Sequence, residues 1–229
     1  MSKKYQEKAK LVSRGKLYSP ADALALISQT ARTKFVESVD LAIKLGINAA
    51  KGGFSIRAVV PLPHGSGKKV RIAVISKPDK VAEALAAGAA VAGSDDLIEK
   101  ISKGFLDFDI LLATPDMMGQ VGKLGKFLGT KGLMPNPKSG TVTPDIAKAV
   151  SEFKAGKVEF RMDKGGVVHM ILGKANFPAE HLLANLDASI AAVQKTKPSG
   201  TKGAYLKSIT ISNSMGPGIK IDPRSFIHE

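Results

Sequence analysis

The sequence predicts a protein of mixed α/β and α+β class. A discontinuous α+β domain is built from both ends of the chain, residues 1–65 and 157–229, and a Rossmann-like parallel βα domain is inserted over residues 66–156. Apolar residues alternate with a period of two near both ends, whereas short apolar runs and helical patterns alternate in the middle. The charge is also uneven: of 34 Lys/Arg and 20 Asp/Glu, the middle holds 13 and 10, and the ends hold 21 and 10. A length of 229 residues suits two domains.

The first part of the chain indicates two helices followed by a strand. Ser19 and Pro20 have the pattern of an N-cap followed by proline at the first helical position. Apolar and polar residues then alternate over residues 38–47, which is typical of a half-buried strand. We expect Gly52 and Gly53 to turn the chain, and residues 56–62 to return as the partner of that strand.

The middle section indicates a small parallel sheet with helices on its faces. Residues 70–75 form a short apolar run, as expected of a strand that is covered on both sides. Ser94 and Thr143 each precede a helical pattern as an N-cap. The other predicted strands are 89–92 and 108–113, and the predicted helices are 78–87, 94–101 and 143–154.

The last third returns to alternating strands. Residues 158–162 and 167–172 flank an Asp-Lys-Gly-Gly sequence at 163–166, which predicts a β-hairpin. Pro178 opens a long helix with apolar residues at helical spacing. Residues 205–212 indicate a further strand that carries hydroxyl side chains on one face.

Two crossings to the insert are required, near residues 65–68 and 154–157, and we expect a hinge there. The first crossing, Gly-Ser-Gly-Lys, resembles a truncated phosphate loop. A phosphate loop also needs an earlier glycine, where Leu62 stands, and a hydroxyl after the lysine, where Lys69 stands. A basic connector is therefore the better interpretation of this segment.

Composition excludes several classes of chemistry. The chain has no cysteine, which removes disulfides, thiolate catalysis and cysteine-bound zinc. Its four histidines lack metal-ligand spacing and no nucleophile–base pair is evident, so we expect no metal, cofactor or catalytic residue. Hydrophobic content is an ordinary 44%, and no run approaches the roughly 20 apolar residues of a membrane span. We expect a cytoplasmic protein that is monomeric when free.

The net charge of +14, concentrated in the two ends, favours a polyanionic partner. A surplus of this kind is typical of proteins that exchange counterions with nucleic acid. Phenylalanine can stack on an unpaired base, lysine reaches phosphates, and serine or threonine hydroxyls meet ribose 2′-OH groups. Segments that combine these residue types lie before the first strand, at the hairpin and after the hydroxyl-lined strand: Thr33-Lys34-Phe35, Asp163-Lys164 and Ser214-Met215-Gly216.

The insert contains a glycine-spaced segment without a dinucleotide-binding fingerprint. We expect its glycines to allow close helix packing, followed by a solvent-facing loop over residues 133–141. Its lysines offer a secondary RNA surface: Lys123, Lys126, Lys131 and Lys138.

Taken together, these segments resemble the L-one family of bacterial large-subunit ribosomal proteins over nearly the whole chain. The most specific stretches are residues 125–137, 62–65 and 214–217. The resemblance implies that the discontinuous domain contacts RNA through Lys34, Phe35, Ser38, Asp163, Lys164, Ser214, Met215 and Gly216. One departure is Ser214, where the family commonly has threonine; the hydroxyl is kept and a methyl group is lost.

The same resemblance implies a non-enzymatic function and three RNA partners. The family binds large-subunit ribosomal RNA to form the mobile stalk beside the tRNA exit site, and it assists release of deacylated tRNA. It also represses translation by binding its own operon mRNA. Two alternatives stay open from the residues alone: an RNA-modifying enzyme that uses the insert as a nucleotide or cofactor domain, and a general DNA-compacting protein.

Overall fold

A computed structural model describes residues 3–13, 15–31, 33–47, 56–198 and 203–226. The chain forms two compact units. The terminal unit combines Met1–Lys68 with Gly156–Glu229, and the insert is Lys69–Ala155. The predicted boundaries lay at 65/66 and 156/157. The predicted turn at Gly52 and Gly53 lies outside the described residues.

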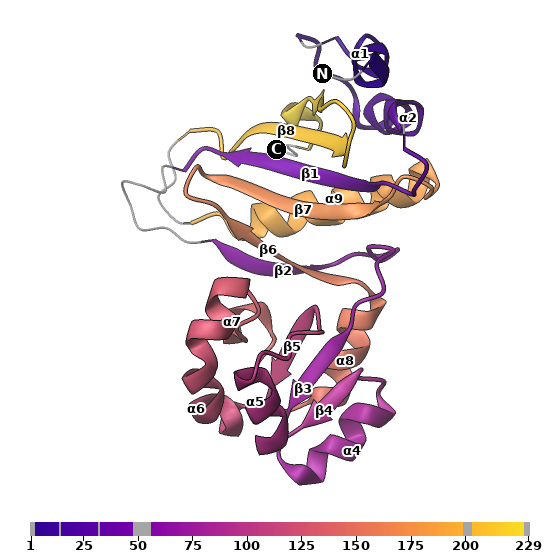
Figure 1. The fold of residues 1–229 in the computed structure, drawn as a ribbon. Coiled ribbons are helices and arrows are strands. Elements are labelled where there is room, and N and C mark those ends of the chain that lie inside the picture. Colours follow the sequence, from indigo (N-terminus) through magenta and orange to yellow (C-terminus); the bar gives the residue numbers. More distant parts are fainter. Residues whose placement is uncertain (1–2, 14, 32, 48–55, 199–202, 227–229) are drawn as a thin grey trace. The chain divides into compact units, whose positions relative to one another are not determined.

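The terminal unit is built on a six-stranded antiparallel sheet in the order β2-β6-β7-β1-β8-β9 (Figure 1). The hairpin predicted at 163–166 is confirmed, because β6 and β7 pair on either side of it. The strands are β1 (Ser38–Leu45), β2 (Arg57–Pro61), β6 (Lys157–Met162), β7 (Val167–Lys174), β8 (Leu206–Asn213) and β9 (Ile219–Ile221).

One predicted strand pairing is wrong. β2 was expected to return against β1, but it pairs with β6 at one edge of the sheet. β1 has only two edges, and β7 and β8 occupy both of them along almost its whole length. Because strands that follow each other in sequence pair only about two-thirds of the time, sequence order alone was a weak guide here.

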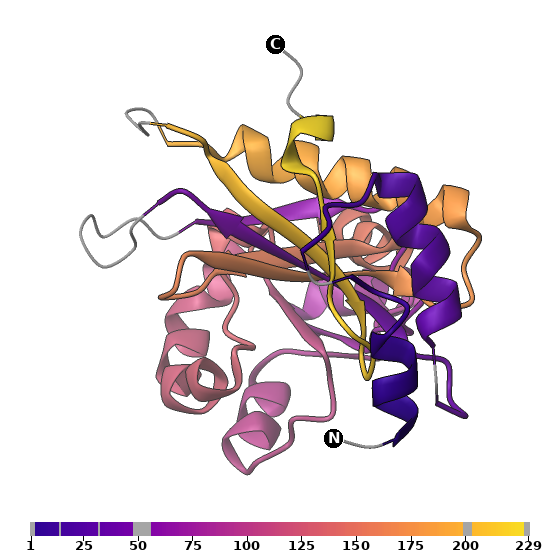
Figure 2. The ribbon, with the colours of Figure 1, turned by 90° about the horizontal axis from the view of Figure 1, so that it is seen from above.

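Among the residues described, three α-helices belong to this unit, α1 (Lys3–Ala9), α2 (Pro20–Thr30) and α9 (Ala179–Lys195), together with the short 3-10 helix η4 (Pro223–Phe226). The predicted cap of α2 is confirmed, since the Asp22 N–H donates to Ser19 Oγ at 3.2 Å. α2 contacts β8, β9 and α9, and α9 also contacts β7 (Figure 2). Leu24 and Ile27 of α2 and Leu186 of α9 join the core between helices and sheet.

Alternation along the strands decides which sheet face is covered. In β1 the residues Val39, Leu41, Ile43 and Leu45 are buried in the helix-facing core. Their neighbours on the opposite face, from Ser38 to Lys44, are only half-buried. Since successive side chains point to opposite faces of a sheet, one face is packed and the other stays open.

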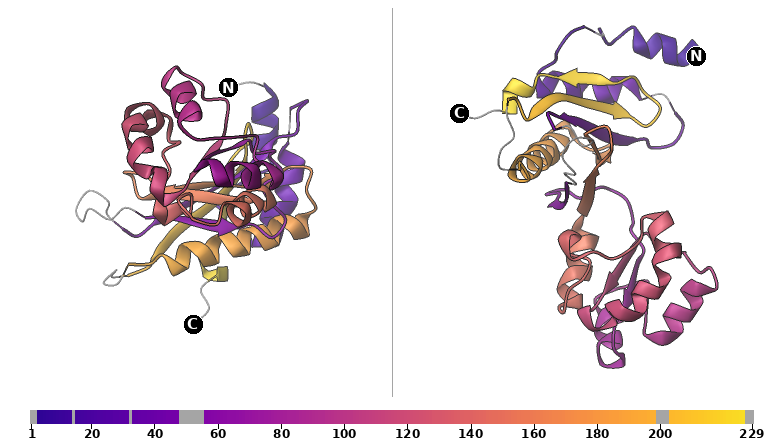
Figure 3. Two further views of the ribbon diagram at one scale, coloured as in Figure 1. Left: turned by 90° about the horizontal axis from the view of Figure 1, so that it is seen from below. Right: turned by 90° about the vertical axis from the view of Figure 1, so that its left-hand side faces the viewer.

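The insert is a three-stranded parallel sheet, β4-β3-β5, with helices on both faces (Figure 3). α4 and α8 pack on one face, and α5, α6 and α7 pack on the other. The fold class predicted from the sequence is therefore confirmed. The elements are β3 (Ile72–Ile75), β4 (Val91–Gly93), β5 (Ile110–Ala113), α4 (Pro78–Ala86), α5 (Asp95–Ser102), α6 (Met118–Val121), η2 (Gly122–Leu124), α7 (Gly125–Lys131), η3 (Pro137–Ser139) and α8 (Ile146–Ala155).

Three expectations about the insert are corrected. The strand expected at 89–92 is β4, which begins at Val91. Ser94 precedes α5, but its side chain makes no capping hydrogen bond. The glycines expected to allow close packing do not do so, because a Cβ added at any of them would meet open space: Gly119, Gly122, Gly125, Gly129 and Gly132.

The loop expected to face solvent is partly buried. Ser139 and Thr141 are buried, and the Asn136 N–H donates to Thr141 Oγ1 at 2.7 Å. Ser139 Oγ and Thr141 Oγ1 lie 3.1 Å apart within hydrogen-bonding distance. These hydroxyls satisfy the loop backbone internally, which removes the cost of burying it. Pro137 and Lys138 stay exposed, as predicted.

The first crossing segment is anchored to the terminal unit by a buried amide. Asn185 of α9 accepts the His64 N–H at 3.1 Å and donates through Nδ2 to the Gly65 carbonyl at 3.0 Å and the Leu172 carbonyl at 2.7 Å. Gly156 has φ +114°, and a Cβ there would lie 2.3 Å from Gly65 Cα. Only glycine therefore permits this close backbone approach.

Candidate nucleic-acid interface

The N-terminal and C-terminal segments of the terminal unit meet where β1 begins and β8 ends, at Ser38 and Ser214. The Ser38 N–H donates to Ser214 Oγ at 3.2 Å, and the Ser214 N–H donates to the Ser38 carbonyl at 3.0 Å. The side chains next to these bonds face solvent: Phe35 is 60% exposed and Met215 is 48% exposed. Six of the eight predicted RNA-contact residues lie in these two segments, here called the loop–turn cluster: Lys34, Phe35, Ser38, Ser214, Met215 and Gly216.

A buried carboxylate holds the loop–turn cluster together. Glu37 is only 1% exposed, and it accepts hydrogen bonds from the Thr33 N–H at 3.0 Å and the Met215 N–H at 3.0 Å. Thr33 Oγ1 also donates to it at 2.9 Å. Charge-assisted bonds of this kind are stronger than neutral ones and fix geometry. Glu37 therefore positions the segments that carry Phe35 and Met215.

Glu37 was not among the residues predicted from the sequence. The sequence predicts an exposed side chain for an acidic residue beside a basic loop, because Glu is almost never fully buried unless it is paired. Its partner at Met215 is 178 residues away, so no local pattern reveals the pairing. The only local signal was its place immediately before the alternating strand.

Gly216 and Asn213 shape the turn after β8. The Gly216 N–H donates to the Asn213 carbonyl at 2.9 Å, and a Cβ on Gly216 would lie 3.1 Å from Asn213 Cβ. The buried Asn213 side chain donates through Nδ2 to the Ile27 carbonyl at 2.7 Å. The turn is thus tied to α2, and a side chain at 216 would crowd that anchor.

Asp163 and Lys164 lie at the far end of β1 from the loop–turn cluster. The Val167 N–H donates to Asp163 Oδ1 at 2.7 Å, and the Leu45 N–H donates to the Gly166 carbonyl at 2.9 Å, which places the hairpin beside the end of β1. Ser38 at the start of β1 pairs instead with Lys174. At about 3.3 Å per residue the two groups are roughly 20 Å apart along the strand. The single constellation inferred from the sequence is therefore two groups.

Hydrogen bonding makes Asp163 part of the turn itself. The backbone N–H of Val167, and then that of Gly165, lower the pKa of the Asp163 carboxyl below its usual value of 3.8. The carboxylate is therefore ionised at neutral pH and closes the hairpin, which leaves the neighbouring Lys164 exposed at its tip.

The open face of the sheet lies between the two groups. One row of directly opposed residues, here called the cross-sheet row, runs across all six strands, and its members share that face. It contains three cationic side chains and one imidazole among six residues: Arg57, Arg161, His169, Ala42, Thr210 and Lys220. Arg57 is paired with Glu159, whereas Arg161 and Lys220 are exposed. No local sequence pattern reveals this row, because strand order and register bring its residues together.

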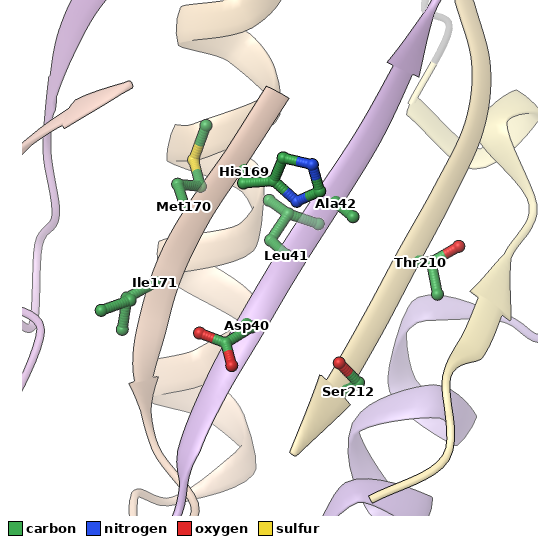
Figure 4. Close-up of a pocket in the computed structure, with 8 residues that line it drawn as sticks. All are labelled: Asp40, Leu41, Ala42, His169, Met170, Ile171, Thr210 and Ser212. Atoms are coloured by element: carbon green, nitrogen blue, oxygen red, sulfur yellow. The ribbon is translucent and has the colours of Figure 1, made fainter. Parts of the chain in front are cut away.

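A hollow of about 470 Å³ lies over β7, β1 and β8 on this face (Figure 4). Asp40, His169, Thr210 and Ser212 supply its polar side chains. Burial raises the pKa of the Asp40 carboxyl above 3.8, although the charges of Lys174 and His169 act in the opposite direction. The hollow thus combines two hydroxyl groups and an imidazole with one carboxylate whose charged form is disfavoured by burial.

These side chains can bind an anionic, hydroxyl-bearing polymer, and their geometry offers little for catalysis. The polar side chains that line the hollow come from three strands, Asp40 from β1, His169 from β7, and Thr210 and Ser212 from β8, and they stand apart rather than converging as a nucleophile–base pair (Figure 4). Within the described ranges, no three His, Asp or Glu residues come together as a candidate metal site. Across the same residues, no helix combines the length and apolar character that crossing a bilayer requires.

The predicted secondary contacts belong to the insert. Lys123 is in η2, Lys126 and Lys131 are in α7, and Lys138 is in η3. All four side chains are exposed. These lysines are part of a separate unit from the loop–turn cluster.

An open antiparallel sheet with exposed cations, hydroxyls and a solvent-facing phenylalanine is the surface of a nucleic-acid-binding protein. The sequence model of the ribosomal protein L1p/L10e family matches residues 27–217, well over half of the chain, and the protein belongs to that family. It is accordingly a large-subunit ribosomal protein that binds ribosomal RNA. The family is structural, so the alternative of an RNA-modifying enzyme is wrong.

Proposed function

We propose that the open face of the terminal unit grips a folded region of large-subunit ribosomal RNA. In this proposal the loop–turn cluster binds one part of the RNA, and the hairpin with Asp163 and Lys164 binds a second part roughly 20 Å away along β1. The two arginines and the one lysine of the cross-sheet row contact phosphates between these two parts. The mutual hydrogen bonds of Ser38 and Ser214 are the observation that carries the proposal, because they bring both chain ends to one surface.

The chemistry of this surface favours RNA over duplex DNA. Phe35 offers an exposed ring for an unpaired base, and Thr210 and Ser212 offer hydroxyls that can pair with ribose 2′-OH groups. Exposed cations add affinity that does not depend on sequence. Recognition then rests on the shape of a folded RNA rather than on a base-edge code, which also argues against a DNA-compacting function.

Three finer roles belong to the same proposal. The protein forms the mobile stalk beside the tRNA exit site and assists release of deacylated tRNA. It also represses its own operon mRNA, which competes with ribosomal RNA if both use the loop–turn cluster. We further propose that it acts in the cytoplasm as a monomer when it is not on the ribosome, and that residues 65–68 and 154–157 form a hinge.

Footprinting with the full chain tests the proposal. The protein is titrated onto its own large-subunit ribosomal RNA and, separately, onto the leader of its own transcript, and protected nucleotides are mapped. We expect F35A to weaken both complexes by roughly 5- to 150-fold, the contribution of one stacked base. L17A removes another exposed apolar side chain of the terminal unit and serves as the control. Equal affinities for F35A and L17A contradict the proposal; protection of ribosomal RNA alone contradicts only the repressor role.

A further inference from the structure

A segment of the insert is strongly one-sided in charge. From residue 117 to residue 144 the sequence contains four lysines and no Asp or Glu. In the described part of the chain, none of these lysine ammonium groups forms an ion pair with a carboxylate. By contrast, Lys77 and Lys103 elsewhere in the insert are paired with Asp116 and Glu99.

Helical spacing sorts this segment into a buried side and an exposed side. Val121, Leu124 and Leu128 recur at intervals of three and four residues, and all three are buried against the sheet. The intervening residues are consequently turned away from that core. They include Lys123, Lys126 and Phe127, all of which are exposed.

Phe127 stands out on this exposed side because it is aromatic and 51% exposed. Gly125 and Gly129 precede and follow it by two residues, and apart from its chain neighbours and the backbone of its own helix neither has an atom within 4 Å of the position a Cβ would take. No neighbouring side chain from these positions therefore shields the ring or the adjacent backbone. A flat ligand can reach the ring face, and phosphates can reach the lysines beside it.

We propose that Phe127, with Lys123, Lys126 and Lys131, forms a second RNA-binding surface that takes an unpaired nucleotide. The base stacks on the Phe127 ring, and the lysines contact the phosphates on either side. Charge complementarity supports this occupant, since an acid-free stretch with unpaired ammonium groups favours a polyanion. Stacking supports the single-stranded form, because a base inside a duplex has no free face to offer. The proposal deepens the RNA-binding function and rests on it.

The test uses the full chain and a short single-stranded RNA that carries 2-aminopurine, compared with the same strand in a duplex. We expect the wild type to quench the single-stranded probe, and F127A to weaken binding by about 5- to 150-fold, the usual contribution of one stacked base. L85A is the matched control, because Leu85 is a 49%-exposed apolar residue on α4 of the same unit. It should bind like the wild type.

A charge-matched pair tests the lysines separately. K123A/K126A and K100A/K103A both remove two positive charges from the insert, but Lys100 and Lys103 lie at the end of α5 and just after it. We expect only K123A/K126A to reduce the slope of log affinity against log salt for the single strand, by about 1.4 for two phosphates. The proposal would be overturned if the two double variants had equal slopes of log affinity against log salt, or if F127A and L85A bound the single strand with equal affinity.

Failure of this inference is distinguishable from failure of the proposed function. F35A in the terminal unit should weaken the binding of folded ribosomal RNA and leave the binding of the single-stranded probe unaffected. F127A should weaken the binding of the single-stranded probe and leave the binding of ribosomal RNA unaffected. If F35A does not change the affinity for ribosomal RNA, the proposed function is contradicted, whereas the proposed surface on the insert is not. If F127A weakens duplex and single strand equally, base stacking is wrong and this inference fails.

Discussion

Ser38 and Ser214 are joined by reciprocal hydrogen bonds although 176 residues separate them in the chain. The N–H of each residue donates to an oxygen of the other, one to a hydroxyl at 3.2 Å and one to a carbonyl at 3.0 Å. This contact fixes the loop before β1 against the turn after β8. It therefore aligns the two segments in which most of the proposed RNA contacts lie.

Replacing the Ser214 hydroxyl should weaken both the fold and RNA binding. S214A leaves the Ser38 N–H without its acceptor, and the expected loss is about 0.5–1.5 kcal/mol of unfolding free energy, measured by urea denaturation. S214T keeps the hydroxyl and is the control; it should retain the stability and the affinity for ribosomal RNA. Equal losses in S214T and S214A would show that the hydroxyl has no role.

Changing the buried carboxylate of Glu37 should have a larger effect. In E37Q an amide group replaces one of the oxygens that accept the Thr33 and Met215 N–H groups, so donors face donors. We expect a loss of about 1–3 kcal/mol in the unfolding free energy and weaker binding of ribosomal RNA. E7Q removes the same charge from an exposed position on α1 and should change neither quantity. Unaltered stability in E37Q would contradict the positioning role of Glu37.

The cations of the cross-sheet row should determine the salt dependence of binding. R161A and K220A each remove one exposed cation from the open face, and each should lower the slope of log affinity against log salt by about 0.7–0.9. K195A removes a lysine at the end of α9, and it should leave the slope unchanged. Filter binding of ribosomal RNA over a salt series measures these slopes. A flat wild-type response would contradict the electrostatic part of the proposal.

Asp40 should make stability depend on pH. Because its folded pKa is raised by burial, its contribution to stability is fully present below the unfolded value of 3.8 and is lost as the pH rises through the raised folded pKa. D40N should therefore be more stable than the wild type near neutral pH, by about 0.5–1 kcal/mol after solvent screening, and this advantage should vanish in acid. Thermal unfolding at both pH values measures it, as a shift of roughly 1–4 °C near neutrality. A destabilised D40N would contradict the prediction.

The terminal unit alone should retain most of the affinity for ribosomal RNA. Its core draws only on its own segments, so a chain in which residues 1–65 are joined by a short linker to 157–229 should fold. We expect its affinity to fall by less than about tenfold, since the remaining surface carries the main phosphate contacts. Circular dichroism confirms folding before binding is measured. A folded short chain that does not bind would move the principal site to the insert.

Periodicity predicted the elements of this protein well, because it records which side chains must leave water. The alternation that starts at Ser38 became β1 with the expected buried face, and the run at 70–75 became the covered strand β3. The pattern failed where a long-range partner decided the outcome. β2 shows no sign in its sequence that it would pair with β6, about 100 residues later.

The sequence by itself determined the class of fold, the basic character of both chain ends and the residue types available for binding RNA. These properties are local: they follow from side-chain chemistry and from periods of two or 3.6 residues. Only the tertiary structure separated Asp163 and Lys164 from the loop–turn cluster, buried Glu37 between two distant segments, and aligned Arg161 with Lys220 across the sheet. Those relationships depend on strand order and register, which are set by contacts between residues far apart in the chain.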